Sequence, residues 1–348
     1  KNYCYEQMAS SKKTLKTPTA KDVAQRAGVS TATVSRYYSA PDKIRPATGA
    51  KIAQAIAELS YVPDLNARAL ASRKAQIIGA VVPTLQNAIF AEGMDAMQRY
   101  LNRHNTTLII ASHGYDPEQE YLQVQRLIAH GISGLMLIGT DRLAKTQELV
   151  RQRNLPYCLS WCQRDQIAHP QIGFDNFAAG YAMGREILKM GHTCVGVLSG
   201  ITDWNDRAED RSAGLLACMS EAGHPVPKTR RLETAYDLEE AADAFELLMG
   251  SDNSISCVFC GNDVIAAAAQ KRAQKMNLSI PKDLSITGFD DIAMASALSP
   301  ELTTVHVPHR QMGEMVAKGL LEAIESGNPV ESQKISFLIK RRESLGLI

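Results

Sequence analysis

The 348-residue sequence contains no long apolar segment. A membrane-spanning helix needs roughly 18 or more consecutive apolar residues, and no run approaches that length. The first ten residues, KNYCYEQMAS, also lack the apolar core of a secretory signal. We therefore expect a cytoplasmic protein with no membrane partner.

Cysteines are few and irregularly spaced. The chain has seven, an odd number that favours reduced thiols over a disulfide framework. Cys257 and Cys260 form a CxxC pair, but the segment around them has the composition of a buried strand. Two side chains three positions apart in a strand point to opposite faces. Cys158 and Cys162 have no His or Cys partner at the spacing of a zinc site. The sequence predicts no metal site and no cofactor.

Signatures of common α/β enzymes are missing as well. The first apolar run of the body leads into PTLQNA, without the G-x-G-x-x-G or Walker pattern that holds nucleotide phosphates. There is no G-x-S-x-G nucleophile turn, and the histidines have no metal-binding spacing. We therefore expect that the protein is not an enzyme, although an enzyme with an α/β body remains an alternative.

Acidic residues are scarce at the amino-terminal end. Residues 1–74 contain 13 Lys/Arg and 5 Asp/Glu, a net charge of +8, so the overall charge of +1 leaves −7 on the remainder. A basic module on an acidic body is typical of a nucleic-acid binder with a regulatory part. A solvated tail explains the lysines of residues 1–18, which are expected to form a disordered leader. It does not explain the basic residues of the patterned segments that follow.

Residues 19–62 carry the pattern of three short helices. Thr19 and Asp22 form a capping box at the start of the first helix, and Gly28 suits its end. Ser30 caps a second helix, so the two helices enclose a short turn that contains glycine, as in a helix-turn-helix unit. A third helix begins with Pro46 at its first position, where proline is favoured.

The second helix has a face suited to DNA. Its sequence, STATVSR, offers hydroxyls, methyls and an arginine but no carboxylate, which a polyanion would repel. Thr31 and Ala32 lie at the amino end, which usually enters the major groove, and Arg36 can contact guanine through two hydrogen bonds. A helical hairpin with an ordinary polar face is the alternative. The predicted DNA-binding residues of this helix-turn-helix unit are Thr31, Ala32, Thr33, Ser35, Arg36 and Thr48.

Residues 63–75 form the predicted linker. Pro63 breaks the chain, and Asp64 can cap a helix that is too short to be stable alone. A segment that folds conditionally between two domains is a candidate switch.

From Gln76 onward, short apolar runs alternate with amphipathic stretches. This alternation predicts parallel sheets with helices on both faces, and a division near residue 175 gives two such units. Ligands of parallel sheets bind at the carboxyl ends of the strands, so the cleft between two sheets is the expected small-molecule site. The apolar runs span residues 77–83, 107–112, 134–139, 156–161, 194–200, 257–261 and 284–290.

The segments VAQRAGVSTATVSR, SYVP and NARALAS resemble the headpiece and hinge of the lactose-repressor (LacI) family, and the likeness extends over nearly the whole chain from Thr19. The resemblance implies an all-α helix-turn-helix headpiece on an α/β body of two periplasmic-binding-protein-like subdomains with parallel sheets. It also implies that Leu70 wedges into the minor groove. The implied parts are residues 19–62 (headpiece), 63–75 (hinge helix), 76–175 plus 307–332 (first subdomain) and 176–306 plus 333–348 (second subdomain).

The headpiece departs from the family pattern at a few positions. Tyr37 and Tyr38 replace Val and Leu, Arg45 replaces a capping Ser, and Gly49 replaces an arginine. These changes affect the detailed geometry of the third helix and some phosphate contacts, but not the identity of the module.

The resemblance also implies a set of effector contacts in the cleft. Each of these residues has a structural alternative, and Asn262 in particular could cap the following helix. Around Arg211 the loop ITDWNDRAED departs in length and composition, so contacts by Asn205 and Arg207 are less defined. The implied effector-binding residues are Ile89, Phe90, Trp161, Asp175, Arg211, Tyr236, Asn262 and Asp290.

Three segments, PTLQNAIFAE, ASHGYDPEQE and GFDNFAAG, are similar to the gluconate-repressor branch of the family. The predicted effector is therefore a sugar or a sugar acid such as gluconate, and Arg211 is chemically suited to a carboxylate.

The predicted function is a sequence-specific transcriptional regulator, in which a homodimer places two headpieces on a pseudo-palindromic operator. Effector binding would move the first subdomains relative to each other and melt the hinge helices. Whether the effector induces or co-represses stays open. A transport binding protein shares the body, but it would need a signal peptide and has no use for residues 19–72.

Overall fold

The computed structural model describes residues 17–62, 76–165 and 167–348. The chain folds into two compact units, Lys1–Ala75 and Gln76–Ile348, which are described separately. Residues 1–16 of the expected leader at 1–18, and the expected hinge at 63–75 with Leu70, lie outside the described residues. Within the described ranges, no helix combines the length and the apolar character that crossing a bilayer requires.

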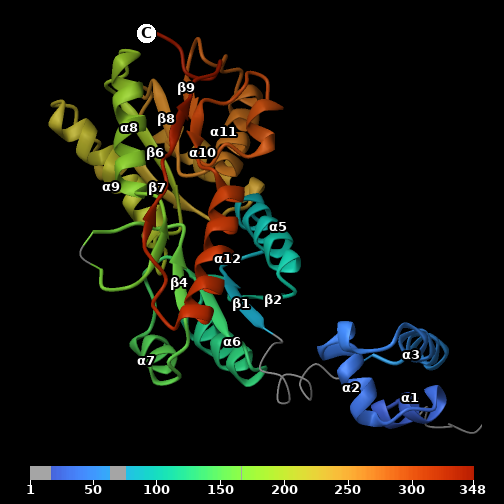
Figure 1. Ribbon diagram of the computed structural model, residues 1–348. Helices are drawn as coiled ribbons and strands as arrows, with labels where there is room; N and C mark the ends of the chain where they lie inside the picture. Colours follow the sequence, from blue (N-terminus) through green and yellow to red (C-terminus); the bar gives the residue numbers. More distant parts are fainter. Residues whose placement is uncertain (1–16, 63–75, 166) are drawn as a thin grey trace, which may run out of the picture. The chain divides into compact units, whose positions relative to one another are not determined.

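Residues 17–62 of the first unit form three α-helices and one 3-10 turn: α1 (Ala20–Ala27), α2 (Thr31–Ser39), η1 (Pro41–Lys43) and α3 (Pro46–Leu59) (Figure 1). The predicted capping box is present, because the backbone N–H of Thr19 donates to Asp22 Oδ2 at 2.8 Å and the Thr19 hydroxyl accepts from the backbone of Asp22. Gly28 ends α1 with a φ of 67°, a backbone conformation that glycine adopts at little cost. These local signals fix where the turn between α1 and α2 lies.

A small apolar core closes this unit. Val34 of α2 is buried, and Tyr37 and Tyr38 pack partly buried against the core. Gly49 lies beside Tyr37, since a Cβ at position 49 would make an ordinary van der Waals contact of 3.7 Å with Tyr37 Cε2. Arg45 precedes α3 without a side-chain cap, as its departure from a capping serine predicts. The buried core residues are Val23, Ala24, Ala27, Val34, Ile52 and Ala55.

The second unit contains two parallel sheets. We call the part built on the first sheet the first subdomain and the part built on the second sheet the second subdomain. The first sheet has the order β11-β5-β4-β3-β1-β2, and the second has the order β7-β6-β8-β9. The first sheet consists of β1 (Ile77–Val82), β2 (Thr107–Ser112), β3 (Gly134–Ile138), β4 (Tyr157–Ser160), β5 (Gln171–Gly173) and β11 (Gln333–Lys334). The second consists of β6 (Val195–Gly200), β7 (Arg231–Thr234), β8 (Cys257–Cys260) and β9 (Ser285–Thr287).

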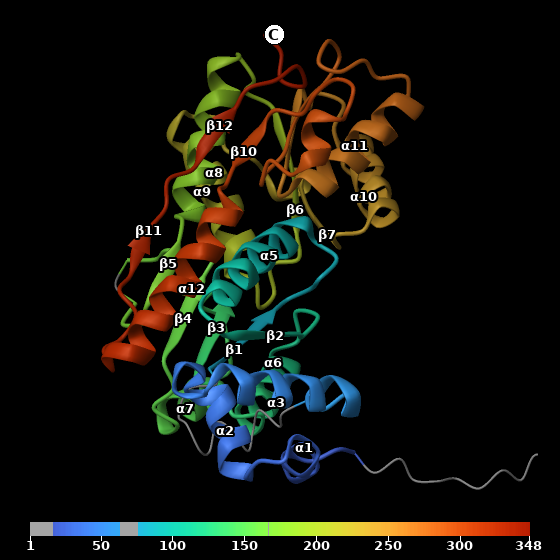
Figure 2. The same cartoon turned by 45° about the vertical axis from the view of Figure 1, so that its right-hand side comes forward.

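Helices cover both faces of the first sheet. The helices α5 (Ala88–Arg103) and α12 (His309–Ser326) pack side by side over one face (Figure 2). The helices α6 (Pro117–Ala129) and α7 (Ala144–Gln152) cover the other face, where a separate apolar core forms. Alternate residues of β1 explain the two cores, because Ala80 and Val82 point to the first and Val81 to the second.

The second subdomain is flanked by two helix pairs. The first pair is α8 (Asn176–Lys189) with α9 (Asp206–Glu221), and the second is α10 (Leu238–Ser251) with α11 (Asp263–Lys275). Glycines at 180 and 214 let α8 and α9 approach closely, since a Cβ at Gly180 would clash with the backbone of Arg211. The remaining elements are η2 (Lys228–Arg230), η3 (Ala293–Ser296), β10 (Thr304–His306) and β12 (Leu338–Lys340), of which β10 and β12 form an antiparallel pair.

Every apolar run that the sequence predicts as a strand of the body forms one, and the predicted parallel α/β body is confirmed. The structure differs at the last crossing. The family resemblance implies that the chain leaves the first subdomain after residue 332, yet Gln333 and Lys334 pair with Ile172 and Gly173 in the first sheet. A strand of two residues has no apolar alternation that a sequence pattern could detect.

The CxxC segment behaves as predicted for a buried strand. Cys257 and Cys260 both lie in β8, and each packs into a different apolar core. Burial raises the pKa of the Cys257 thiol. These cysteines fill space on opposite faces of the second sheet.

Candidate functional site

The exposed face of α2 carries most of the predicted DNA-binding residues. Thr31, Ala32, Ser35 and Arg36 are exposed on the described part of the headpiece. Thr33 is only half-exposed, because its hydroxyl lies 2.8 Å from the Ser30 hydroxyl at the start of the helix. The exposed face thus offers two hydroxyls, two methyl groups and a guanidinium group.

Two of the three carboxylates in residues 17–62 bond to other groups of the headpiece. Residues 17–62 contain six Lys/Arg and three Asp/Glu. Asp22 belongs to the capping box, and Glu58 accepts from Arg26 Nε at 2.6 Å between α1 and α3. Thr48 lies half-buried in the first turn of α3. The headpiece is therefore net positive, which suits a polyanion.

A second candidate site lies at the carboxyl ends of the strands, between the two subdomains of the body. The cavity there measures about 10 Å³, room for roughly one water molecule. Its walls come from the segments that follow β1, β2, β6, β7 and β9, as expected for parallel sheets. The lining residues are Asn87, Ile89, Phe90, Tyr115, Asn205, Arg207, Ala208, Arg211, Tyr236 and Asp290.

A buried ion pair forms one wall of this cavity. Arg211 Nη2 lies 3.1 Å from Asp290 Oδ1, and the two side chains are 6% and 2% exposed. The rest of the guanidinium is also engaged: Nε donates to Asn176 at 2.9 Å and Nη1 to the carbonyl of Gly261 at 3.1 Å. The Phe289 ring lies 3.9 Å from the guanidinium carbon. Arg211 is thus held in one position by groups of the protein.

Burial gives Asp290 unusual properties. Desolvation raises the pKa of its carboxyl group to about 6, although Arg211 acts in the opposite direction. Its backbone has a φ of 107°, which a non-glycine residue rarely adopts. Strained backbone and perturbed pKa values are concentrated at functional sites, so both observations mark Asp290 as a candidate ligand contact.

Aromatic rings face each other across the cavity. Tyr115 follows β2 in the first subdomain and Tyr236 follows β7 in the second, and their rings stack with centroids 5.6 Å apart. Asn205 fixes the second ring by donating to the Tyr236 hydroxyl at 2.9 Å. Each subdomain therefore contributes one ring to the same stack.

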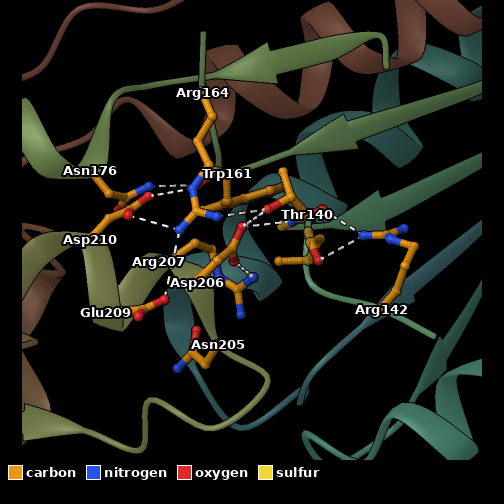
Figure 3. Close-up of polar contacts among 12 residues, drawn as sticks. Thr140, Arg142, Trp161, Arg164, Asn176, Asn205, Asp206, Arg207, Glu209 and Asp210 are labelled. Atoms are coloured by element: carbon orange, nitrogen blue, oxygen red, sulfur yellow. Dashed lines mark hydrogen bonds and ion pairs between the residues drawn. The ribbon is translucent and has the colours of Figure 1, made fainter. Parts of the chain in front are cut away.

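A polar cluster next to the cavity joins the two subdomains (Figure 3). Arg207 donates through Nη1 to Asp206 Oδ1 at 2.8 Å, and Asp206 also accepts from Thr140. Arg164 makes two hydrogen bonds of 2.8 Å to Asp210. Thr140 and Arg164 belong to the first subdomain, whereas the other three belong to α9 of the second.

The structure brings five of the eight predicted effector residues to the cavity: Ile89, Phe90, Arg211, Tyr236 and Asp290. The other three have structural contacts. Trp161 is fully buried behind Phe90, with ring centroids 5.6 Å apart. Asp175 caps α8 by accepting from Ala178, and Asn262 caps α11 by accepting from Ile265. For Asn262 the capping alternative thus describes the observed contact.

Tyr115 and Ala208 are cavity residues that the sequence reasoning missed. Tyr115 follows the predicted strand at 107–112, so the rule that ligands bind at the carboxyl ends of strands could have found it. Ala208 follows Arg207 in a loop and helix start whose length departs from the family pattern, and no signal marks it.

Comparison with known proteins agrees with this architecture. The model of the bacterial regulatory proteins, lacI family, matches residues 19–64, and the periplasmic binding protein-like domain matches residues 185–345. The HTH-type transcriptional repressor PurR of Vibrio parahaemolyticus serotype O3:K6 (strain RIMD 2210633) is 30% identical over 311 residues, which cover 88% of this chain and 92% of that protein.

Two further proteins are similar to this chain, one in sequence and one in fold. The HTH-type transcriptional regulator GntR of Escherichia coli (strain K12) is 28% identical over 309 residues, 89% of this chain and 92% of that protein. The crystal structure of a LacI-family regulator from Silicibacter pomeroyi superposes with a TM-score of 0.86 at 21% identity, over 94% of this chain and 99% of that chain. This chain therefore belongs to the LacI family: it is a DNA-binding transcriptional repressor with an effector-binding domain, and not an enzyme.

Proposed function

We propose that this repressor binds a pseudo-palindromic operator as a homodimer in the cytoplasm, and that a sugar acid such as gluconate, bound in the cleft, controls its operator affinity. The observation that carries the effector assignment is the lining of the cavity. Two buried arginines, Arg207 and Arg211, lie there with three aromatic rings. Cations suit a carboxylate, and aromatic faces suit the C–H groups of a sugar skeleton.

The two arginines have different roles in this proposal. Three nitrogens of Arg211 already contact Asn176, Gly261 and Asp290, so Arg211 mainly fixes the wall of the site. Arg207 lines the same cavity and donates to Asp206 through Nη1. Its planar guanidinium has five N–H donors, so a second edge can serve a ligand carboxylate. We therefore assign the acid group of the effector to Arg207.

Hydroxyl groups of the effector would meet Asp290 and Asn205, which also line the cavity. A sugar acid is far larger than a cavity of about 10 Å³, so its entry requires the two subdomains to separate locally. A ligand that binds one arrangement of the subdomains better than another shifts the protein toward it. This differential binding is the proposed source of control.

On the headpiece, Thr31, Ala32, Ser35 and Arg36 are proposed to contact base edges because they are exposed along α2. Thr33 and Thr48 are half-buried hydroxyls, which suit the phosphate backbone. The minor-groove role of Leu70 rests on the family resemblance alone.

Self-association is supported by two exposed apolar side chains in a groove of the second subdomain that charged residues also line. A groove of about 710 Å³ runs between α10, α11 and η3. Leu238 and Met294 line it and are 50% and 38% exposed. Exposed apolar residues around a groove are typical of protein interfaces.

Fluorescence anisotropy of the full-length protein on the DNA upstream of its own gene tests this proposal, with calorimetric titration of D-gluconate. We expect binding that prefers one palindromic site over random duplex, and a change of at least 10-fold in operator affinity with gluconate. Equal binding to all duplexes would overturn the operator assignment. The effector assignment fails if gluconate and related aldonates do not bind while a neutral sugar or a purine does.

A further inference from the structure

We infer that Asp206 is a positioning residue that holds the ligand-facing Arg207 in the second subdomain and Thr140 in the first subdomain at the same time. Recognition of an acid group and closure of the cleft would then be coupled through one carboxylate. The part of this inference that concerns a ligand rests on the proposed function.

The geometry of Asp206 divides its two oxygens between two tasks (Figure 3). Oδ1 accepts from Arg207 Nη1 at 2.8 Å. Oδ2 accepts from the Thr140 backbone N–H at 2.6 Å and from the Thr140 hydroxyl at 2.7 Å. Thr140 follows β3, whereas Asp206 is the first residue of α9, so the second pair of bonds crosses between the subdomains. One carboxylate thus contacts both subdomains that form the cleft.

The carboxylate depends on these partners because it is completely buried. Burial acts to raise the pKa of Asp206, but Arg207, the two bonds from Thr140 and the charge of Arg164 outweigh it, and the pKa is lowered. Asp206 is thus an anion at neutral pH. If the subdomains part, it loses two donors that only the first subdomain supplies.

Arg207, like Asp206, is packed closely against the first subdomain. A Cβ at Gly139, next to Thr140, would clash with both Arg207 and Asp206, so the backbone of the first subdomain lies directly against the pair. The Asp206 charge helps to raise the pKa of Arg207 although burial opposes it. The guanidinium is therefore a fixed cation at the wall of the effector cavity.

A second bridge runs parallel to the first. Arg164 of the first subdomain bonds both oxygens of Asp210 in α9, and its Nη1 lies 3.3 Å from the Thr140 hydroxyl. Its side chain is 30% exposed and that of Asp210 22%, so water weakens this pair more than it weakens the contacts of Asp206. Asp206 is therefore the stronger of the two links.

The charges of Asp206, Arg207 and an acidic ligand determine which arrangement of the subdomains the ligand favours. A ligand carboxylate on Arg207 brings a second anion close to Asp206, so the two anions share one cation. The N–H and O–H of Thr140 offset part of the Asp206 charge, but only when the cleft is closed. An acidic ligand therefore favours the closed arrangement more than a neutral ligand of the same shape does. The recognised class is a polyhydroxylated carboxylic acid.

Hydrogen exchange of the full-length protein without any ligand tests whether Asp206 joins the two subdomains through Thr140. The Thr140 amide is followed by mass spectrometry in the wild type and in Asp206→Asn, Thr140→Val and Thr140→Ser. We expect Asp206→Asn to speed exchange of this amide at least 10-fold, because its acceptor loses its charge. Thr140→Ser should exchange like the wild type. Unchanged exchange of this amide in Asp206→Asn would overturn the inference. If Asp206→Asn does not fold, Thr140→Val provides the test, because its amide at position 140 is expected to exchange several-fold faster than in the wild type.

Titration with D-gluconate tests whether ligand binding at Arg207 is coupled to the contact between Asp206 and Thr140. Thr140→Val removes one donor to Asp206 without touching Arg207, and the expected loss of affinity is about 3- to 10-fold, the worth of one hydrogen bond. The loss should lie in the dissociation rate, and Thr140→Ser should restore the wild-type value. In the Asp206→Asn background, the additional Thr140→Val substitution should reduce the affinity for D-gluconate only slightly further.

These outcomes separate the two proposals. If gluconate does not bind the wild type, the effector assignment is wrong, while the exchange experiment still decides whether Asp206 joins the subdomains. If gluconate binds the wild type and Thr140→Val equally well, the coupling through Asp206 is refuted and the effector assignment stands.

Discussion

The indole Nε1–H of Trp161 donates a hydrogen bond to Nδ1 of His309, at 3.1 Å. Burial lowers the pKa of His309 to about 3, so its ring is neutral at physiological pH. With Nδ1 as an acceptor, the proton lies on Nε2, which donates to the carbonyl of Asp290 at 3.2 Å. One imidazole thus joins the end of β4, the start of α12 and the strained segment after β9.

This link predicts the effect of changing His309. In His309→Leu, the Trp161 N–H and the Asp290 carbonyl lose their partner inside the protein, and each costs about 1–3 kcal/mol. We expect the free energy of unfolding of the body to fall by about 2 kcal/mol or more, measured by urea titration. Trp161 and Trp204 are the only tryptophans in the sequence, so fluorescence reports the body alone. His309→Gln keeps an acceptor and a donor and is the control. Equal stability of the Leu and Gln variants would contradict the role of this ring.

The Arg211–Asp290 pair predicts a larger loss. Arg211→Met leaves a buried carboxylate without its cation, which costs about 3–5 kcal/mol for a buried pair. Arg185→Met on α8 is the matched control, because Arg185 is exposed and its loss should stay within about 0.5 kcal/mol. Urea unfolding at pH 7 measures both. A loss below about 1 kcal/mol in Arg211→Met would show that the pair is not a structural element of the cleft.

The raised pKa of Asp290 predicts a specific pH dependence. The folded protein keeps the proton up to a pKa of about 6, whereas an unfolded aspartate releases it near 3.8. Between these values the folded state binds more protons, so the stability that Asp290 contributes is complete below pH 3.8 and is lost as pH rises through 6. Each pKa unit is worth about 1.4 kcal/mol.

Comparison with Asp290→Asn isolates this contribution. The difference in unfolding free energy between wild type and variant should shift against the wild type from about pH 4.5 to about pH 6.5, and then remain constant. A difference that does not change with pH, or that shifts in favour of the wild type, would show that Asp290 titrates normally.

On the headpiece, Arg36→Ala should remove recognition at one base pair. A two-bond contact to guanine contributes about 1–3 kcal/mol of discrimination, so operator affinity should fall roughly 5- to 150-fold while affinity for random duplex changes little. Arg26→Ala is the control, since Arg26 is paired with Glu58 between α1 and α3. Anisotropy on specific and random duplexes measures both variants. Equal loss on the two duplexes would mean that Arg36 contacts only phosphate.

Much of this architecture could be predicted from local patterns. The helix-turn-helix unit depends on caps that are encoded within a few residues, such as Thr19 with Asp22, and these form as expected. The long strands carry continuous apolar runs because both of their faces are buried. The short strands β5, β7, β10, β11 and β12 lack such runs, and most of their pairing partners are distant in sequence, so no local pattern marks them.

The candidate site could be predicted only in part, for a related reason. The family resemblance implied cleft positions for Phe90 and Asp290, which line the cavity, but it could not distinguish a ligand contact from a helix cap at Asn262. The bonds between Thr140 and Asp206 join residues 66 positions apart. Pairing of this kind follows from the packing of the subdomains, which the sequence pattern does not contain.

The stacked rings of Tyr115 and Tyr236 have a consequence for the thermodynamics of ligand entry. Separating them exposes two aromatic faces to water, which is unfavourable, so the empty cleft resists opening. A carbon skeleton that slides between the rings covers those same faces again. The contact between the two rings excludes water. When a ligand replaces this contact, the burial of the ring faces contributes to affinity, and binding should show a negative change in heat capacity.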